Sequence, residues 1–406
     1  MRTRIVPAAP SEAGRRRPQS RGPFLALVLA ALASFSQALP APAGSQTSAM
    51  APPESRRAEA VAPGVERIEI RRGDFALGIG PDRWVINVLV LDPSRTRLAL
   101  GRAHDKGVGT ETTSSIARRR GALAAVNGGY FRTEGPYRGE PAGIVLSAGK
   151  ILSEPYRRRP GLAVSSRGRR TRLAVVDAVV RVEAVASKNA RRGIDGVNRP
   201  RLLDELILFT PELDRTTMTG PEGTEVIIDR GRVAAVTSGK GDAPIPGSGW
   251  VLSGSGTAAA WLRAEFRRGA RCELRSDVRL SPRPAFAVDF VVGGGPRLVR
   301  NGRPATNDPG LYNPGFSDAR HPRTAVGVRA DGRILLVTVD GRQPERSVGM
   351  TIPELAALLI EIGAVEAINM DGGGSTTMVA GGRVVNSPSD LAGERPVGDA
   401  LLVLVR

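Results

Sequence analysis

The chain has 406 residues, of which 41% are hydrophobic and 24% charged, and its formal net charge is +18. This composition is typical of a globular protein and excludes a largely disordered chain. The single cysteine, Cys272, excludes a disulfide within the chain, and the presence of only two histidines excludes histidine-rich zinc sites.

The first 43 residues have the pattern of a secretion signal. Four arginines between residues 15 and 21 precede an apolar run from Pro23 to Phe35, and small residues and prolines follow through Ala43. The apolar run is shorter than the roughly 20 residues that a membrane-spanning helix needs. We therefore predict a secreted or periplasmic envelope protein with no transmembrane domain beyond this signal segment, an uncleaved anchor being the alternative.

The next segments predict a linker and then one domain. Residues 44–66 are rich in Ala, Pro, Ser and charged residues, which favours a disordered linker. From residue 67 on, short runs of strand-forming residues alternate with Gly, Pro, Asp and Ser turn signals. No later boundary requires a second domain. We predict one large α+β domain over 67–406, with a mixed β-sheet core and packed helices.

Two helices are predicted within this domain. The first covers residues 256–268. The second begins at Thr351, where Thr351 and Glu354 have the spacing of a capping box, and ends before Gly363. Together with strands at 334–339 and 365–370, this second helix forms a βαβ-like unit. Asp340 and Asp371 then lie at the carboxyl ends of the two strands, where α/β sheets tend to place their sites.

Three predicted strands end in glycine clusters. The strand at 365–370 leads into Asp371 and the triplet Gly372–Gly374, followed by hydroxyl side chains. The strand at 122–126 leads into Asn127-Gly128-Gly129, and the strand at 286–292 leads into Gly293–Gly295. Because glycine lets a ligand approach the backbone closely, this recurring design predicts one shared cleft.

The charge predicts an anionic partner. The leader carries a net charge of +5, from six arginines and Glu12, which leaves +13 for the rest of the chain. Such a charge favours phosphate-containing polymers by electrostatic attraction. Nucleic acid is not expected, because the chain is only 4% aromatic and has no nucleic-acid-binding motif. No P-loop, dinucleotide-binding or serine-hydrolase motif is present either.

The motifs that remain are NGGYF at 127–131, GGGP at 293–296, RHPRT at 320–324, VDGR at 339–342, NMDGGGST at 369–376, and VNSP at 385–388 followed by ER at 394–395. In these motifs and in their order, residues 119–406 resemble the phosphodiester glycosidase family. The resemblance implies an α+β fold and hydrolysis of a sugar-1-phosphodiester on its sugar side. The substrate would be a phosphate-linked envelope or exopolysaccharide glycan.

The residues fit that chemistry, because an oxocarbenium-like centre needs a carboxylate and a phosphate needs arginines and amides. We predict Asp371 as the principal catalytic carboxylate, with Glu140 and then Asp340 as its partner. The predicted substrate-binding residues are Asn127, Gly128, Arg199, Glu225, Gly294, Arg320, Arg323, Thr324, Gly372, Gly373, Gly374, Ser375, Thr376 and Arg395. No cofactor is clearly implied, although Glu140, Asp340 and Asp371 leave a divalent cation open.

Two alternatives come from other functional classes. One is a non-catalytic envelope protein that binds anionic polymers through the same cleft. The other is a secreted phosphodiesterase or nuclease, which usually needs a metal held by several acids. Asp371 favours catalysis over simple binding, because a carboxylate next to a phosphate gives no advantage to a protein that only binds polyanions.

Overall fold

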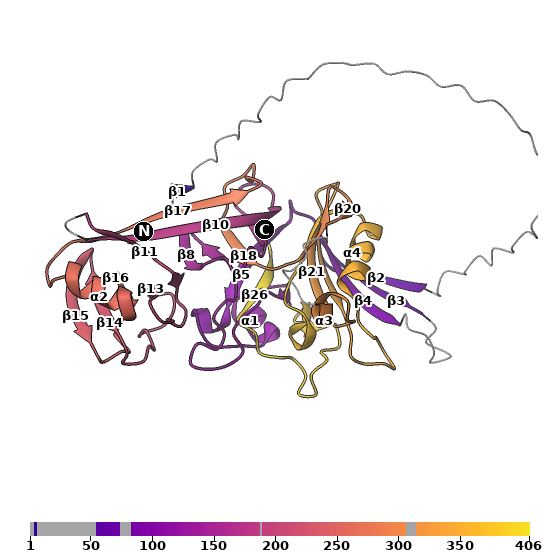
Figure 1. Ribbon diagram of the computed structural model, residues 1–406. Helices are drawn as coiled ribbons and strands as arrows, with labels where there is room; N and C mark the ends of the chain where they lie inside the picture. The colour runs from indigo at the N-terminus through magenta and orange to yellow at the C-terminus, as the bar shows by residue number, and fades with distance from the viewer. Residues whose placement is uncertain (1–3, 6–53, 74–82, 187–188, 306–313) are drawn as a thin grey trace, which may run out of the picture. The chain divides into compact units, whose positions relative to one another are not determined.

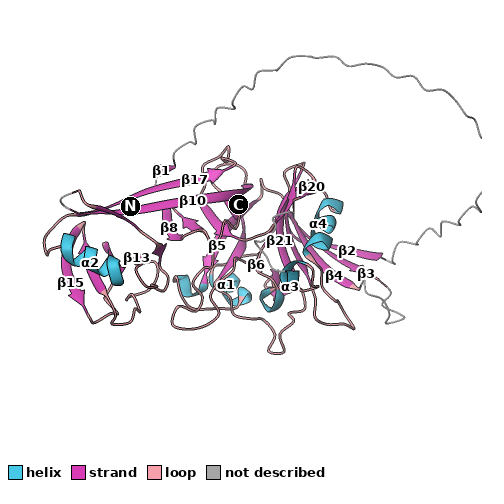
Figure 2. Cartoon of the chain, viewed as in Figure 1, coloured by secondary structure: helices cyan, strands magenta, loops and turns pink. Residues whose placement is uncertain are grey.

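The computed structural model describes residues 4–5, 54–73, 83–186, 189–305 and 314–406, which belong to one compact unit. In these residues strands predominate over helices (Figures 1 and 2). The strands pair into four sheets, two of eight strands and two of five. Apart from the two short parallel pairs β1–β17 and β12–β13, the described ladders are antiparallel.

The first sheet is built around the two longest strands, β10 (Arg172–Ala186) and β17 (Cys272–Ser281), which pair side by side (Figure 1). Its strand order is β1-β17-β10-β9-β18-β7-β8, with β11 beside β10. The other members are β1 (Arg4–Ile5), β7 (Val145–Ser147), β8 (Lys150–Ser153), β9 (Gly161–Ser165), β11 (Arg191–Gly193) and β18 (Phe290–Gly293).

The second sheet has the order β12-β13-β16-β14-β15. Its members are β12 (Gly196–Val197), β13 (Leu206–Phe209), β14 (Thr224–Asp229), β15 (Arg232–Ser238) and β16 (Gly249–Gly254). Helix α2 (Gly256–Glu265) buries Ala258 and Leu262 in the same hydrophobic cluster as Val226 and Leu252 of this sheet. The predicted helix at 256–268 is therefore present, three residues shorter than expected.

The third sheet has the order β2-β3-β4-β22-β21-β23-β19-β20. Its members are β2 (Glu54–Ala62), β3 (Val65–Arg72), β4 (Trp84–Leu91), β19 (Arg297–Arg300), β20 (Arg303–Pro304), β21 (Arg323–Arg329), β22 (Ile334–Val339) and β23 (Ala364–Asn369). Since β21 lies antiparallel between β22 and β23, these two run in the same direction and the start of β21 lies beside their carboxyl ends.

The second predicted helix is α4 (Ile352–Glu361), and it has the predicted capping box. The Thr351 hydroxyl accepts a bond from the Glu354 N–H, and the Glu354 carboxylate accepts one from the Thr351 N–H. Such caps stabilise a helix by about 1 kcal/mol. Leu355 and Leu359 of α4 belong to a buried cluster with the third sheet, as the periodicity predicted. The β22–α4–β23 unit is thus confirmed, with β21 inserted between its strands.

The fourth sheet has the order β25-β24-β6-β26-β5. Its strands are β5 (Thr96–Arg102), β6 (Ala124–Asn127), β24 (Met378–Ala380), β25 (Arg383–Val384) and β26 (Asp399–Val405). Helix α1 (Thr113–Arg119) packs on it through Ile116. The short elements η1 (Ala103–Asp105), α3 (Pro314–Ser317) and η2 (Gly373–Ser375) complete the described secondary structure.

Three sheets contribute to a central hydrophobic cluster. Val292 of β18, Ile368 of β23 and Val126 of β6 are fully buried in it and come from the first, third and fourth sheets. Each of these strands continues, within a few residues, into one of the three glycine clusters. The shared core therefore places the three glycine clusters at neighbouring strand ends.

The predicted α+β fold with packed helices is wrong, because the described residues form mostly β-structure in four sheets with four short α-helices. The chain contains 49 glycines and 31 prolines, which break it into short strands and tight turns. The sheets bury much of their apolar surface against one another, where an α+β fold would use helices. The helical pattern of α4 was correct locally, but local periodicity does not show how sheets stack.

The predicted disordered linker at 44–66 also needs correction in its second half. Residues 54–62 form β2, which pairs antiparallel with β3. Cross-strand ion pairs, Arg72 with Glu54 and Arg67 with Glu59, support this pairing. Composition alone missed the strand because its charges are satisfied by a neighbouring strand. The predicted signal, apart from Arg4–Ile5 in β1, and the first part of the linker lie outside the described residues.

Candidate active site

The three glycine clusters meet, as the sequence predicted. The Asp371 N–H donates to the Gly128 carbonyl at 3.1 Å, and the Gly295 N–H donates to the Asn369 carbonyl at 2.7 Å. A Cβ on Gly129 would lie 2.7 Å from the Gly293 carbonyl oxygen, so these two backbones touch. This close backbone approach requires glycine and joins the ends of β6, β18 and β23.

Asn127 holds the Asp371 segment in place. Its side-chain N–H donates to the Asp371 carbonyl at 2.7 Å, and its side-chain oxygen accepts bonds from the Thr324 hydroxyl at 2.7 Å and the Thr377 N–H at 3.2 Å. Asn127 and Thr324 are fully buried. Both predicted site residues therefore lie next to Asp371, and these bonds position the Asp371 segment.

Asp371 lies two residues after the end of β23 and is partly exposed. Its Oδ1 accepts a hydrogen bond from the Gly372 N–H at 2.9 Å. Desolvation raises the pKa of Asp371 to about 6 and outweighs the lowering by Ser375, Gly372 and Arg395. The charge of Asp399 raises this pKa further. A carboxyl group that titrates near neutral pH can both accept and donate a proton during turnover.

Asp399, which the sequence analysis did not select, is the second carboxylate of the site. It begins β26, is 3% exposed, and accepts the Gly129 N–H on its Oδ1 at 2.7 Å. Burial raises the pKa of Asp399 to about 6, against the lowering by Gly129 and Arg102. The available signal was a Gly398-Asp399 pair directly before the last apolar strand, a pattern that a search for glycine clusters misses.

Two arginines flank the glycine triplet. A Cβ on Gly373 would lie 3.1 Å from Nη2 of Arg342, and a Cβ on Gly374 would lie 2.2 Å from Nη2 of Arg395. Arg395 makes a two-point ion pair with Asp390, at 2.7 and 3.0 Å. Gly373 and Gly374 thus each lie against a guanidinium group, and a side chain on either residue would crowd that group.

Arg342 is exposed and has a left-handed backbone, with φ of 60°. Its Nη2 lies 3.4 Å from Nδ1 of His321, and no carboxylate among the described residues pairs with it. A left-handed backbone at a residue other than glycine is found more often at functional sites, which makes this exposed arginine beside Gly373 a candidate site residue. It was part of a motif that was recognised, VDGR at 339–342, but was not selected as a site residue.

Several buried polar atoms near Asp371 lack partners within the described part of the chain. They include the Asn369 side-chain oxygen and the hydroxyls of Thr376 and Thr377. Ser375 and Thr376, both predicted site residues, are buried in the same turn as the glycine triplet. Gly294 packs against the Asn369 carbonyl, so it too belongs to this assembly. The site therefore retains polar groups that can bind water or ligand.

Three predicted site residues, Glu140, Arg199 and Glu225, have side-chain partners outside the glycine clusters. Glu140 accepts a bond from Arg132 at 3.0 Å, and burial raises its pKa to about 7, with Arg132, Glu154 and Arg199 as its charged neighbours. The groups that shift the pKa of Asp371 most are different ones, namely Ser375, Gly372, Arg395 and Asp399. A partnership of Glu140 with Asp371 stays a prediction. Arg199 is held by ion pairs to Glu154 and Glu205.

Glu225 is also engaged away from the glycine clusters. Its carboxylate accepts bonds from the Thr217 and Thr219 hydroxyls at 2.8 and 2.9 Å and from the Ala243 N–H at 3.0 Å. It lies on β14 of the second sheet and is 2% exposed. These bonds connect the 217–219 and 243 turns to the sheet, and a substrate-binding role for Glu225 stays a prediction.

Asp340, although at the predicted strand end, has both carboxylate oxygens occupied. One accepts bonds from the Ser387 N–H at 3.0 Å and from Asn386, and the other pairs with Arg346 at 3.1 Å. Burial raises the pKa of Asp340. A catalytic role for Asp340 stays a prediction, and it would require these contacts to rearrange.

Arg323 and Arg320 lie at the start of β21 and just before it, and both have extensive partners. Arg323 is 1% exposed and donates to the carbonyls of Met350, Phe316 and Ala319 at 2.7–2.9 Å. Burial lowers the pKa of Arg323 to about 10. Arg320 pairs with Glu354 of the α4 cap. Contact of Arg323 with phosphate stays a prediction and would have to use its remaining nitrogen, Nη1.

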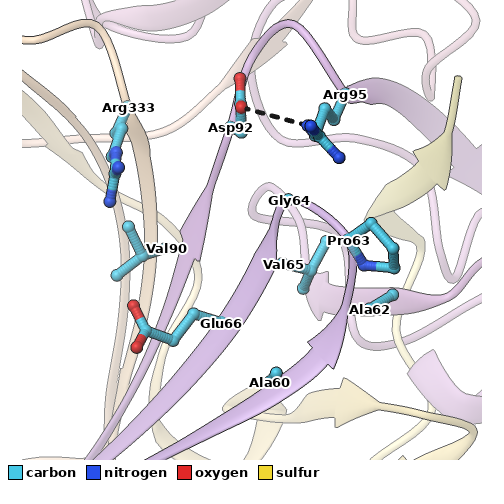
Figure 3. Close-up of a pocket in the computed structure, with 10 residues that line it drawn as sticks. All are labelled: Ala60, Ala62, Pro63, Gly64, Val65, Glu66, Val90, Asp92, Arg95 and Arg333. Carbon is cyan, nitrogen blue, oxygen red and sulfur yellow. Dashed lines mark ion pairs between the residues drawn. The ribbon is translucent and has the colours of Figure 1, made fainter.

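The described residues contain no group of three or more His, Cys, Asp or Glu side chains placed to hold a metal ion. Glu140, Asp340 and Asp371 do not form such a group. A separate hollow lies between β2–β4 and the turn at Asp92–Arg95, where Asp92 and Arg95 form an ion pair at 3.8 Å (Figure 3). It shares no residue with the glycine site.

The decisive comparison concerns residues 222–404, which match the family model for phosphodiester glycosidases. The predicted resemblance to that family is confirmed over these residues. The matched part includes Asp371, Asp399, Arg342 and Arg395. Asn127 and Glu140 lie outside it.

Two relatives are similar in sequence to this chain over short stretches. The chain is 40% identical over 85 residues to the N-acetylglucosamine-1-phosphodiester α-N-acetylglucosaminidase of Bos taurus, covering 21% of this chain and 16% of the bovine protein. It is 36% identical over 106 residues to an SPbeta prophage-derived uncharacterized protein of Bacillus subtilis, covering 26% of this chain and 16% of that protein. The chain thus aligns with about a sixth of each relative's length.

A solved structure supports the whole fold. A putative exported protein of Burkholderia pseudomallei superposes with a TM-score of 0.76 at 27% identity, over 87% of this chain and 97% of that one. Because it covers 87% of this chain, the likeness extends beyond the residues of the family match. In the described residues no helix has the length and apolar character to cross a membrane.

Proposed function

We propose that the protein hydrolyses glycosyl phosphodiesters between the sugar and the phosphate. The observation that carries this proposal is Asp371, a carboxyl group with a pKa of about 6, next to a glycine triplet that lies against the guanidinium groups of Arg342 and Arg395. Water would attack the anomeric carbon while the bond from that carbon to the phosphate oxygen breaks. The products would be a free sugar and a phosphate monoester.

The charge of the leaving group indicates which residues would assist its departure. The departing phosphate monoester is a weak base, so its stabilisation by cationic and N–H donors matters more than a strong general acid. Arg342 has no carboxylate partner in the described structure and is therefore the guanidinium most available to a phosphate. Arg395 is already paired with Asp390 and can act by orienting the triplet or by exchanging partners.

Asp371 would stabilise positive charge at the anomeric carbon, either by attack or by activation of water. Its rigid support, through Asn127 and Gly128, keeps the carboxylate in a fixed position before substrate arrives. Asp399 would act through the Gly128–Gly129 backbone and through its charge. The retaining and inverting routes differ in the separation of two carboxyl groups, about 5 Å and roughly 6.5–9.5 Å respectively.

The substrate and location are part of the same proposal. A phosphate-linked envelope or exopolysaccharide glycan agrees with the charge of +13 outside the leader. Export is supported by the leader pattern and by the description of the Burkholderia structure as a putative exported protein. N-terminal sequencing of the native protein should find cleavage between about Ala38 and Gly44. A cytosolic protein that still begins at Met1 would contradict export.

A panel of sugar-1-phosphodiesters, incubated with the protein with and without chelator, tests the activity. We expect release of reducing sugar from at least one compound. Loss of that release on chelation would show that a cation takes part. Binding of the panel without turnover would instead support the polymer-binding alternative.

A further inference from the structure

A basic hollow lies next to the β19–β20 hairpin, outside the candidate active site. Its volume is ≈ 640 Å³, within the range of about 300–1,000 Å³ typical of ligand sites. The residues that line it include three arginines, Arg297, Arg300 and Arg303, together with Asp177 and Pro160. Its charged lining distinguishes it from the mostly apolar pockets that bind drug-like molecules.

Arg297 lines one side of this hollow and is held in place by its hydrogen bonds. Its side chain is 93% buried, with Nη1 donating to Glu366 and Nη2 donating to the Val175 carbonyl, both at 3.0 Å. A guanidinium held from two sides keeps its position and loses little further freedom when a ligand binds. The hollow is therefore preorganised on one side.

The positive charges in the hollow are not balanced. Arg300 and Arg303 are exposed, and among the described residues neither pairs with a carboxylate. Burial lowers the pKa of Arg297, and the charge of Arg300 lowers it further, which means that the two cations repel. The facing negative groups are Asp177 and Glu366, so three guanidinium groups meet two carboxylates. A phosphate would relieve this repulsion and match the guanidinium geometry.

The hollow adjoins the glycine site. Pro160, which lines it, accepts a hydrogen bond from the Gly294 N–H at 3.0 Å, and Gly294 belongs to the converged glycine clusters. The backbone of Arg300 on β19 is in register with that of Glu366 on β23, and Asp371 follows Glu366 by five residues. At about 3.3 Å per residue this separates Arg300 from Asp371 by roughly 16 Å along the strand. An extended ligand can span this distance, whereas a single sugar phosphate cannot.

We propose that the hollow at Arg297, Arg300 and Arg303 is a second phosphate site, which binds a polymeric substrate carrying phosphates at intervals while another of its phosphodiesters lies at Asp371. This inference rests on the proposed function for the choice of substrate, but the binding site itself does not depend on catalysis. It makes the natural substrate a repeating glycosyl phosphodiester and gives it an advantage over a small sugar-1-phosphodiester.

A binding experiment tests the site directly. The full-length protein is titrated with fluorescently labelled short-chain inorganic polyphosphate at several salt concentrations. The Arg300→Gln/Arg303→Gln variant should bind more weakly, and its plot of log affinity against log salt should be shallower by between about 1 and 2. Asp177→Asn should bind more tightly than wild type, because it removes a negative charge from the same hollow.

The matched control is Arg268→Gln/Arg283→Gln, which removes two exposed arginines outside the hollow. If both double variants weaken polyphosphate binding equally, the effect comes from net charge and the proposed site is wrong. An unchanged affinity in Asp177→Asn would contradict it as well. Circular dichroism melting of each variant separates a lost site from a lost fold.

An activity experiment tests the link to substrate. With a small sugar-1-phosphodiester, Arg300→Gln/Arg303→Gln should keep the wild-type kcat/KM. With an oligomer of sugars joined by phosphodiesters, the same variant should show a raised KM at nearly unchanged kcat. Equal kinetics on the oligomer would contradict the second site. If the wild-type protein cleaves neither compound while the binding results hold, the proposed function fails and the anion site stands.

Discussion

Asp371 and Asp399 are both hydrogen-bonded to Gly128, and Asp399 is also bonded to Gly129. The Asp371 N–H donates to the Gly128 carbonyl, the Asp399 carbonyl accepts the Gly128 N–H at 3.0 Å, and the Asp399 carboxylate accepts the Gly129 N–H. A Cβ on Gly128 would lie 2.0 Å from the Asp399 carboxylate, so a side chain there would break the arrangement. The two acids therefore influence each other through one short piece of backbone and through their charges.

For Asp371 itself, the Asp371→Asn substitution keeps the shape and removes the charge. We expect the rate on the best sugar-1-phosphodiester to fall by at least about 100-fold, as is typical for the loss of an acid or base. The matched control is Asp289→Asn, at a carboxylate that accepts the Ser166 N–H at 2.7 Å just before β18, at the end of that strand opposite its glycine cluster. Wild-type kinetics in Asp371→Asn would remove this residue from the chemistry.

For Asp399 we predict a change in pH dependence. Its negative charge raises the pKa of Asp371, so Asp399→Asn should lower that pKa. The limb of the pH–rate profile that reports Asp371 should move to lower pH, whichever protonation state is active. Asn can still accept the Gly129 N–H, so the backbone contact is retained. A merely structural role for Asp399 would reduce activity at all pH values without moving the limb.

Among the elements, the turn after β23 depends most on its residue types. Gly373 has φ of 60° and lies against Arg342, whereas Gly382 has φ of 75° with open space around its Cα. Both positions are strained for any other residue, by about 1–2 kcal/mol. They differ in what a methyl group would touch. This difference separates backbone strain from displacement of the arginine.

We predict that Gly373→Ala and Gly382→Ala lower the free energy of unfolding by similar amounts. Only Gly373→Ala should reduce activity, because its methyl group would crowd the Arg342 guanidinium. Chemical denaturation and steady-state kinetics on the two variants measure these quantities. Full activity in Gly373→Ala would show that the triplet is an ordinary turn.

Local sequence signals predicted the parts of the fold that depend on near neighbours. The α4 cap needs only Thr351 and Glu354, and each glycine cluster directly follows its own strand. Asp399 was missed because its importance arises when β26 pairs with β6, residues that are far apart in the chain. Asp371 was selected because it lies in a motif that resembles those of a known family. The neighbours of Glu140 include Glu154 and Arg199, which are distant in the chain, so no local pattern could predict its surroundings.

At the scale of the molecule, buried acids set a pH dependence of stability. The folded pKa of Asp371 and Asp399, at about 6, exceeds the ordinary aspartate value of 3.8. Between these pH values the folded state binds more protons than the unfolded state, so this contribution to stability decreases as pH rises from about 4 to 6. Glu111, whose pKa is lowered to about 2 despite desolvation, mainly by Arg119, His104 and Ser115, acts in the opposite sense below about pH 4.5.

The Asp371→Asn variant provides the test. Relative to wild type, its melting temperature should increase between pH 4 and pH 8, because the substitution removes a group whose ionisation is unfavourable in the fold. Comparing the two proteins at each pH cancels the effect of the high net charge. A difference that stays constant with pH would show that the Asp371 pKa is not raised.

The central claim is that the whole molecule cleaves the sugar side of a glycosyl phosphodiester. Hydrolysis in isotopically labelled water, followed by mass spectrometry of both products, tests this most directly. We predict that the heavy oxygen enters the sugar and that the phosphate monoester stays unlabelled, because water attacks the anomeric carbon. Label in the phosphate would show attack at phosphorus, as in a phosphodiesterase or nuclease, and would contradict this account.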